Sequence, residues 1–329
     1  MEPLEAYACY NKNLDVRLSS SSGAIFTALA ENVLENNGIV YGVAMTEDCY
    51  GAEFIRVEDK HLLNKLRGSK YLQAKVGDAY KNVKNDLLAG RQVLFGGTGC
   101  QVNGLKNFLG KNYENLLCVD VICHGAPSPA LWRKYAKNQE TKHGGKLKYI
   151  NFRCKDISWM DYGIQAVIAT AGSTKTLYIS KDNDPYMQMF LRDYCLRPSC
   201  YACAAKKIKK SDLTIADFWG IDGVASEMND GNGTSLVLIR TKKGNEFFNK
   251  ISVSMKFKQV VYDKAVLCNP SEYKSCARPV ERDVFFKDMD SMSFDELAKK
   301  YTASRKYKMT SKVKKIVKDV MKVIVHRTN

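Results

Sequence analysis

The chain has 329 residues, with 51 Lys and Arg against 35 Asp and Glu, which gives a formal net charge of +16. Hydrophobic residues make up 45% of the chain and charged residues 26%, so a wholly disordered protein is excluded and the length suffices for a large core. The sequence has neither an apolar run of the roughly 18 residues that a membrane-spanning helix needs nor a secretory signal, so we expect a cytoplasmic protein.

The first recognisable elements are a Ser-rich turn, a helix and a strand. Residues 19–22 are all serine and precede Gly23, residues 24–35 have the apolar spacing of a helix, and residues 39–44 have a strand pattern. Such a turn at the start of a helix presents free backbone N–H groups that suit a phosphate, and an ordinary serine cap has the same sequence. Both interpretations remain open at this point.

Helices and buried strands alternate through the next part of the chain. Helical patterns cover residues 61–66 and 78–89, and apolar runs at 92–95 and 115–122 are typical of buried strands. The first of these strands leads through a Gly/Thr loop into a helix at 103–109. This alternation predicts a largely parallel sheet, whose ligands bind in the loops at the carboxyl ends of the strands.

Short strands become frequent after residue 146. Strand patterns cover residues 149–153, 164–170, 175–179, 211–220 and 236–240, with a helix at 185–194. We therefore predict an α/β fold with α+β character in the second half: a mostly parallel sheet with helices, plus a β-rich insert. Residues 1–146 form the α/β half, and residues 147–300 form a β-rich, cysteine-containing half that completes the same body.

The tail, residues 301–329, is strongly basic and has helical periodicity. Its lysines lie opposite its apolar residues: Lys314, Lys315, Lys318 and Lys322 against Val313, Ile316, Val317, Val320, Met321, Ile324 and Val325. A basic amphipathic helix can lie on an anionic surface such as the inner membrane, or dock on the body or on a partner. Because much of the net charge lies in this tail and no nucleic-acid motif occurs, we expect no nucleic-acid partner.

The eleven cysteines are too many to be incidental, and their odd number in a cytoplasmic chain argues against a disulfide framework. Cys195, Cys200 and Cys203 have the C-x4-C-x2-C spacing seen around iron–sulfur clusters. No His lies nearby for a zinc site, but a distant Cys could complete one, and three thiols in a bent loop could also be structural. Cys100 and Cys123 each follow a predicted strand, so they can meet this group in space.

Six segments stand out in order along the chain. They are residues 20–30, 68–73, 93–101, 119–125, 195–203 and 211–220. Together they resemble the coenzyme F420 hydrogenase/dehydrogenase beta-subunit family, over about residues 16–290. Six motifs in the same order are a specific signal, although each motif alone would be weak.

The resemblance implies an oxidoreductase with FAD and a [4Fe-4S] cluster, in which a hydride passes between the flavin and a small molecule, either deazaflavin-like or a nicotinamide. The flavin then passes single electrons to iron–sulfur centres. Carried over to matching positions, the cluster ligands are Cys100, Cys123, Cys200 and Cys203, with Cys195 in reserve. The residues expected near the flavin are Ser22, Gly23, Ser69, Lys70, Tyr71, Thr98 and Gln101, which makes the first half of the chain the flavin-binding half.

The sequence also departs from the family pattern. The N-terminal ferredoxin segment of many relatives has no counterpart here, so the resemblance implies a separate ferredoxin-like carrier or partner subunit. Gly99 stands where the family has Pro, and Ala24 where it has a second Gly, and both changes bear on flavin affinity. The Cys-His-Gly, Pro-Ser-Cys-Tyr and Asp-Phe-Trp-Gly motifs resemble the bacterial branch associated with polysaccharide biosynthesis.

Two other functions stay open at this point. One is a non-catalytic electron-transfer or scaffold subunit, which the basic tail would dock to a membrane or a complex. The other is a zinc-stabilised homologue that has lost its redox function. Bound flavin would distinguish the proposed oxidoreductase from the zinc-stabilised protein, and turnover would distinguish it from a scaffold.

Overall fold

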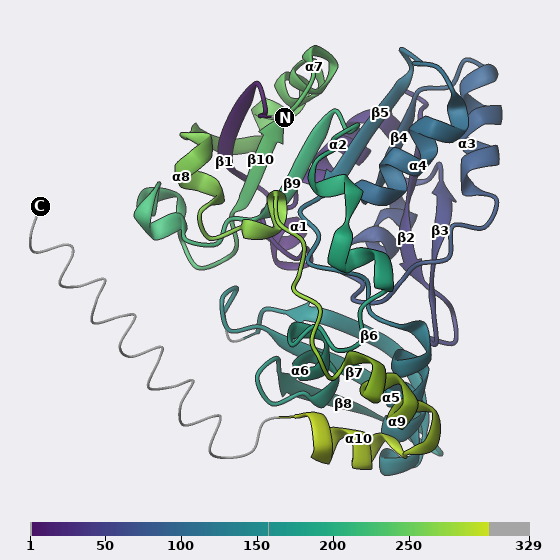
Figure 1. The fold of residues 1–329 in the computed structure, drawn as a ribbon. Coiled ribbons are helices and arrows are strands. Elements are labelled where there is room, and N and C mark those ends of the chain that lie inside the picture. The colour runs from purple at the N-terminus through teal and green to yellow at the C-terminus, as the bar shows by residue number, and fades with distance from the viewer. Residues whose placement is uncertain (1, 157, 303–329) are drawn as a thin grey trace, which may run out of the picture.

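The computed structural model describes residues 2–156 and 158–302 (Figure 1). The predicted basic tail helix therefore lies outside the described residues. Within those two ranges, no helix combines the length and the apolar character needed to cross a membrane.

An eight-stranded sheet forms the centre of the larger part of the molecule, in the order β11-β1-β10-β9-β5-β4-β2-β3. Strands β2, β4, β5 and β9 pair in parallel, and antiparallel strands extend the sheet on both sides. The strands are β1 (Glu5–Asn11), β2 (Ile39–Met45), β3 (Ala52–Val57), β4 (Val93–Thr98), β5 (Leu116–Val121), β9 (Leu213–Asp217), β10 (Ser235–Ile239) and β11 (Met255–Gln259). The parallel centre with its helices confirms the predicted α/β fold class.

Helices cover both faces of this sheet (Figure 1). α3 (Ala79–Leu88) and α4 (Gly99–Leu109) pack on one face with Phe95 of β4, whereas α2 (Ile25–Glu35) and α7 (Lys242–Ile251) pack on the other face with Leu94. Successive residues of a strand point to opposite faces, so one apolar run supplies both cores.

A second sheet of three antiparallel strands lies in the lower part of Figure 1. Its strands are β6 (Lys146–Cys154), β7 (Gly163–Thr170) and β8 (Ser173–Ser180), which match the predicted β-rich insert. It shares a core with α5 (Pro129–His143), α6 (Pro185–Leu191), α9 (Arg282–Ser291) and α10 (Phe294–Tyr301). Trp132, Phe152 and Tyr186 are buried there, and their rings contact one another in tilted and edge-to-face arrangements.

Short helices complete the fold. The α-helical ones are α1 (Leu14–Leu18) and α8 (Tyr262–Val266), and the 3-10 turns are η1 (Lys60–Leu66), η2 (Pro198–Ala202), η3 (Ala204–Lys206), η4 (Ile221–Gly223), η5 (Ser226–Met228), η6 (Ser252–Ser254) and η7 (Pro270–Glu272). Residues 61–66, predicted as a helix, thus form a 3-10 turn. The sequence prediction did not include β1, β3, β11, α1, α5 or the helices α7 to α10, and its division at residue 146 stays a prediction.

The Gly/Thr loop predicted after residue 95 is in fact the end of β4. Gly96 and Gly97 continue the strand and leave room for aromatic rings on its two faces. A Cβ atom added at Gly96 would lie 2.3 Å from the ring of Phe26, and one at Gly97 would lie 3.2 Å from the ring of Phe54. These glycines therefore serve the packing of the sheet, and α4 begins directly after Thr98 without an intervening loop.

Asp184 links α5 and α6, two helices that pack on the smaller sheet. Its carboxylate is completely buried before α6, where it accepts hydrogen bonds from the backbone N–H of Met187 (2.8 Å) and the hydroxyl of Tyr135 in α5 (2.7 Å). Burial raises the pKa of Asp184 to about 6, because the protein interior disfavours the charged carboxylate. The folded protein therefore holds this proton more tightly than the unfolded chain does.

This raised pKa predicts a pH-dependent stability. The contribution of Asp184 is present at low pH and is lost as the pH rises from about 4 to about 6, since the folded state must then hold a charged, buried group. Asp184→Asn keeps the helix cap but cannot titrate. Between pH 5 and pH 7 we expect the free energy of unfolding of the wild type to fall by about 1 kcal/mol relative to the variant. Urea unfolding at both pH values measures this, and a constant difference would contradict it.

Candidate functional site

The carboxyl ends of β4, β5 and β9 lie side by side at one edge of the large sheet. The register aligns Thr98 with Val121, and Val121 with Ile215. The antiparallel strand β10 adds its first residue, Ser235, opposite Asp217 at the end of β9. Neighbouring strands are about 4.8 Å apart, so the loops that continue from these ends meet in one region, as expected for a sheet of this class.

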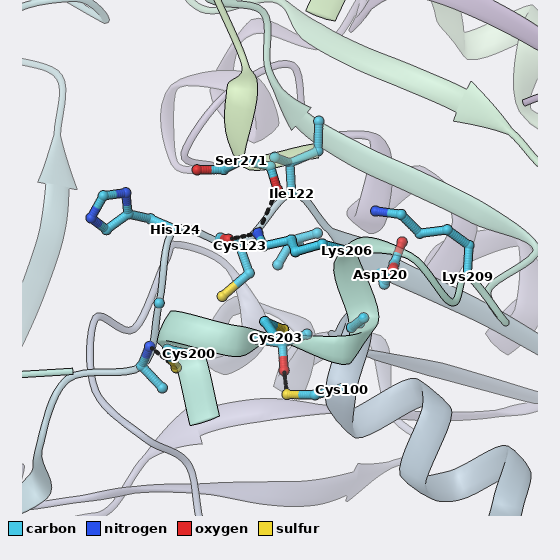
Figure 2. A pocket seen from close by; sticks show the side chains of 16 residues that line it. Cys100, Asp120, Ile122, Cys123, His124, Cys200, Cys203, Lys206, Lys209 and Ser271 are labelled. Carbon is cyan, nitrogen blue, oxygen red and sulfur yellow. Dashed lines mark hydrogen bonds between the residues drawn. The ribbon is translucent and has the colours of Figure 1, made fainter. Parts of the chain in front are cut away.

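Four cysteines line one pocket at this sheet edge (Figure 2). Cys100 lies in the first turn of α4, Cys123 follows β5, Cys200 lies in η2, and Cys203 follows η2. Cys100 is exposed and the other three are partly buried. The structure thus brings the four predicted ligands together. Cys195, the reserve ligand, lies instead in the core of the smaller sheet, completely buried.

A partly buried cation and a backbone donor lie against these thiols. The ammonium group of Lys206 donates to the carbonyl of Cys123 (2.5 Å) and to that of Ser271. The backbone N–H of Ala126 donates to the sulfur of Cys200 (3.4 Å). Burial raises the pKa of Cys123 to about 12, and the charge of Lys206 opposes this shift. Both features favour the thiolate form that a metal ligand must adopt.

Gly99 lies against a buried carboxylate that also lines the pocket. A Cβ atom added at Gly99 would lie 2.9 Å from Oδ2 of Asp120. The other carboxylate oxygen accepts hydrogen bonds from the hydroxyls of Ser211 (2.9 Å) and Thr214 (2.5 Å), while burial raises the pKa of Asp120. The missing side chain at position 99 therefore leaves room for this carboxylate beside Cys100.

The residues predicted near a flavin fall into two groups, of which the first surrounds the Ser-rich turn. The hydroxyl of Ser22 donates to the carbonyl of Thr234 (2.8 Å), and the N–H of Gly23 donates to the hydroxyl of Ser235 in β10 (2.9 Å). The N–H of Ser69 donates to the hydroxyl of Ser21 (2.8 Å). These bonds hold the turn and the segment around Ser69 together at the same sheet edge.

Cationic side chains converge on this turn. Arg67, Arg153 and Lys155 each donate a hydrogen bond of 3.4 Å to residues 19–22. Among the described residues, Nε of Arg67 and both Nε and Nη1 of Arg153 are buried without a hydrogen-bond partner. Burial of the Lys70 ammonium group lowers its pKa to about 7. Such unpaired, desolvated donors fit an anion such as a phosphate, which would also restore the charge of Lys70.

The Asp-Phe-Trp-Gly motif positions one of these cations. Asp217 accepts hydrogen bonds from Nη2 of Arg153 (2.8 Å) and from the indole N–H of Trp159 (3.0 Å). Trp219 of the motif stacks on Trp159, with ring centroids 5.2 Å apart. The motif therefore holds Arg153 beside the Ser-rich turn, a role that the sequence alone did not indicate.

The second group, Thr98 and Gln101, lies beside the cysteine pocket. The hydroxyl of Thr98 is 3.2 Å from the sulfur of Cys100, and its backbone N–H donates to Oε1 of Gln101 (2.9 Å). Both side chains thus help to form the first turn of α4. Tyr71, next to Lys70, turns its ring to Phe152 in the core of the smaller sheet. The assignment of these residues to a flavin stays a prediction.

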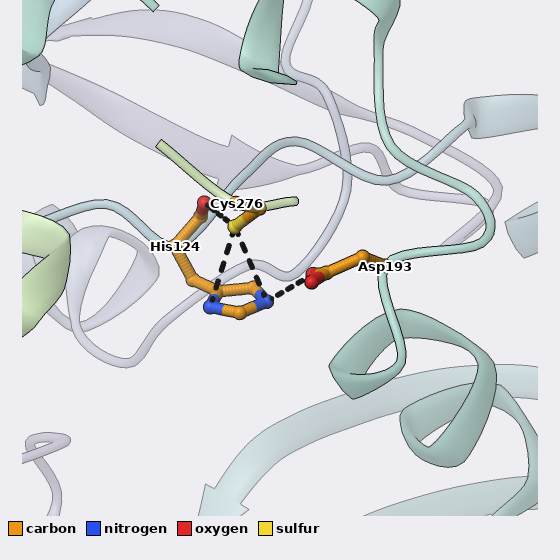
Figure 3. Close-up of side chains that lie close together, drawn as sticks. All are labelled: His124, Asp193 and Cys276. Atoms are coloured by element: carbon orange, nitrogen blue, oxygen red, sulfur yellow. Dashed lines mark hydrogen bonds and ion pairs between the residues drawn. The ribbon is translucent and has the colours of Figure 1, made fainter. Parts of the chain in front are cut away.

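A cluster beside the pocket has no counterpart in the sequence prediction: His124, Asp193 and Cys276, whose ligand atoms lie within 4.8 Å of one another (Figure 3). His124 Nε2 is 2.6 Å from Asp193 Oδ1, and Cys276 Sγ is 3.7 Å from both ring nitrogens. The thiol of Cys276 also donates to the backbone carbonyl of His124 (2.8 Å). Its proton is therefore directed to the backbone and not to an imidazole nitrogen, unlike that of a nucleophile–base pair.

The sequence and the fold match one group of known proteins. Residues 6–81 match the N-terminal part, and residues 90–263 the C-terminal part, of the family described as coenzyme F420 hydrogenase/dehydrogenase, beta subunit. No curated protein matches the sequence. The fold is similar to that of a chain in the xenon-derivatised F420-reducing [NiFe] hydrogenase complex from Methanosarcina barkeri, with 15% identity, a TM-score of 0.52 and 91% of each chain covered.

Ala24 provides a test of strain at this site. It lies directly before α2 with a left-handed backbone (φ 64°), where the Cβ atom costs about 1–2 kcal/mol. After allowance for the greater freedom of Gly in the unfolded chain, we expect Ala24→Gly to raise the free energy of unfolding by up to about 1 kcal/mol in urea titrations. The control Ala28→Gly, inside the same helix, should lower it by about 1 kcal/mol. If Ala24→Gly lowered the free energy of unfolding, the proposed backbone strain at this residue would be wrong.

Proposed function

We propose that this chain, which belongs to the coenzyme F420 hydrogenase/dehydrogenase beta-subunit family, is an iron–sulfur flavoprotein that passes electrons between a small hydride donor or acceptor and a ferredoxin-like partner. The observation that carries the proposal is the meeting of four cysteines in one pocket, at the sheet edge that also holds the cation-rich Ser turn. Converting a two-electron hydride into single electrons requires such neighbouring sites.

The spread of the cysteines supports a [4Fe-4S] cluster over a single zinc ion. In the part of the chain that the structure describes, no three of the four sulfur atoms lie within 4.8 Å of one another. One zinc ion with thiolates at about 2.3 Å would hold them about 3.8 Å apart. A four-iron cluster places its metal ions between the thiolates and so suits a wider set. Cys100, Cys123, Cys200 and Cys203 would hold it, and Lys206 would balance part of its negative charge.

Around the Ser-rich turn, the buried guanidinium nitrogens without a hydrogen-bond partner, Nε of Arg67 and Nε and Nη1 of Arg153, support FAD as the second cofactor. Arg67, Lys70, Arg153 and Lys155 would bind its pyrophosphate, which would give the buried guanidinium N–H groups anionic partners. When bound, the flavin would supply hydride chemistry in two-electron steps and release electrons singly. The turn follows β1 and bonds to β10, three strands from β4, or about 14 Å. An extended dinucleotide can span this distance to the cysteine pocket.

The remaining parts of the proposal concern substrate, partner and setting. The hydride donor or acceptor is deazaflavin-like or a nicotinamide, and the protein acts in the cytoplasm. The similar solved chain is part of a hydrogenase complex, which supports a ferredoxin-like carrier or partner subunit for this chain too. The resemblance to the bacterial branch adds a role in polysaccharide biosynthesis.

Iron analysis tests the ligand assignment. After anaerobic purification we expect about four irons per chain and the broad visible absorbance of a thiolate-bound cluster. Cys200→Ser and Cys203→Ser should each lose at least about half of the iron and of the absorbance, because serine does not replace a thiolate ligand well. Cys268→Ser, at an exposed thiol outside the pocket, is the matched control and should retain both. Full iron in both ligand variants would contradict the assignment, and stoichiometric zinc would favour the structural site.

Flavin titration tests the cation-rich turn. Lys70→Ala should bind FAD about tenfold more weakly, because one charge-assisted hydrogen bond to phosphate is lost. Lys65→Ala, an exposed lysine five residues earlier, is the matched control and should bind like the wild type. Quenching of flavin fluorescence by the apoprotein measures both affinities. If Lys70→Ala bound FAD as tightly as the wild type, the proposed pyrophosphate site at the Ser-rich turn would be wrong.

A further inference from the structure

A cation-rich surface starts at Cys100, the exposed cysteine of the pocket. The segment that follows Cys203 runs along α4: Nδ2 of Asn103 donates to the carbonyl of Ile208 (2.8 Å), and Lys210 donates to Oδ1 of Asn107 (2.5 Å). These contacts fix the segment beside the helix that carries Cys100. We call the α4–η3 surface the exposed and half-exposed side chains Cys100, Lys106, Phe108, Lys207, Ile208 and Lys210.

The charge of the two segments is entirely positive. Residues 99–111 and 196–211 together contain seven Lys and Arg and no Asp or Glu. Two of these cations, Lys206 and Lys209, point inward, to backbone carbonyls and to the buried Glu272 (3.0 Å). They help to hold the pocket and contribute little to the outer surface.

The outward lysines have no anionic neighbour. Among the described residues, no carboxylate oxygen lies within 4.0 Å of the ammonium groups of Lys106, Lys207 or Lys210. Uncompensated charges of one sign produce a potential that attracts an oppositely charged partner and speeds its association. The α4–η3 surface therefore suits an acidic protein.

Two apolar side chains are exposed on these segments. Phe108 is 50% exposed beside Tyr80 and Lys84 of α3, and Ile208 is 51% exposed next to Lys207. Single exposed apolar residues are ordinary on a protein surface, but here both lie on the surface that includes an exposed pocket thiol. A small apolar contact with a charged rim is typical of weak electron-transfer interfaces, which bury less than about 1,200 Å².

We propose that the α4–η3 surface docks an acidic iron–sulfur protein and that single electrons cross the contact at Cys100. This inference rests on the proposed function, because it needs a cluster at the four cysteines. In each transfer one iron–sulfur centre loses an electron and the other gains it, and no bond forms or breaks. Single-stranded nucleic acid is a weaker match, since it binds on series of aromatic faces and this surface carries Phe108 alone.

Charge reversal in the full chain tests the docking. The variant Lys207→Glu/Lys210→Glu changes two outward lysines, and the control Lys242→Glu/Lys250→Glu makes the same change in net charge on α7, which packs on the opposite face of the sheet. The probe is an oxidised, acidic two-cluster bacterial ferredoxin, titrated by calorimetry at about 25 mM and about 250 mM salt. We expect wild type and control to bind about tenfold more weakly at the higher salt, and the surface variant to bind at least about tenfold more weakly than the wild type at the lower salt.

Equal affinities of the wild type and the surface variant, or no binding by the wild type at low salt, would overturn the docking. So would tighter binding of a labelled single-stranded RNA than of ferredoxin. A stopped-flow experiment with dithionite-reduced ferredoxin and with reduced methyl viologen separates this inference from the proposed function. Loss of docking should slow the ferredoxin reaction of the surface variant alone. Salt-sensitive binding without reduction by either donor would support the docking and refute the redox function.

Discussion

The hydrogen-bonded register of β4, β5 and β9 fixes the position of the cysteine pocket. Thr98, Val121 and Ile215 lie in line across the three strands, so the segments that carry Cys100 and Cys123 start at the same height. A slip of one residue would turn Phe95 and its neighbours to the wrong face of the sheet. The two helical layers thus hold the register by their packing. The pocket therefore depends on the backbone pairing of the sheet before it depends on any thiol.

A buried ionic group ties the other pocket walls to this sheet. Glu272 of η7 is 1% exposed and pairs with Arg240, which follows β10 (2.5 Å), and with Lys209, which precedes β9 (3.0 Å). Loss of one partner of such a pair costs about 3–5 kcal/mol, because the remaining charge stays buried. This arrangement holds the segment after Cys203 against the sheet. It explains how a loop with little regular structure can present two thiols at a fixed place.

The sequence predicted the elements that have strong local patterns and the residues that follow them. The buried strands β4 and β5 have continuous apolar runs, so Cys100 and Cys123 could be placed at one sheet edge before the structure was known. The edge strand β11 could not be predicted, because it buries Met255 alone and shows no alternation. Cys195, the reserve ligand, lies away from the pocket for a reason that the spacing of the cysteines does not show. Its neighbour Leu196 pairs with Pro127, and this bridge turns the thiol into the core although the spacing places it close to Cys200. Contacts between distant segments, such as Cys276 over His124, leave no local pattern at all.

The basic run after Cys203 shows why charge alone is ambiguous in a sequence. Its five residues, 206–210, have the composition of a solvated surface loop, yet they divide by position. Lys206 and Lys209, three residues apart, turn inward to the carbonyl of Cys123 and to Glu272. Lys207 and Lys210, also three apart, turn outward. The inner pair acts on the charge and packing of the pocket, and so on the potential of a cluster bound there. The outer pair acts on the electrostatic potential at the surface that an approaching partner protein meets. One short segment can thus couple the proposed redox site to the proposed docking surface, while the two effects remain separable by substitution.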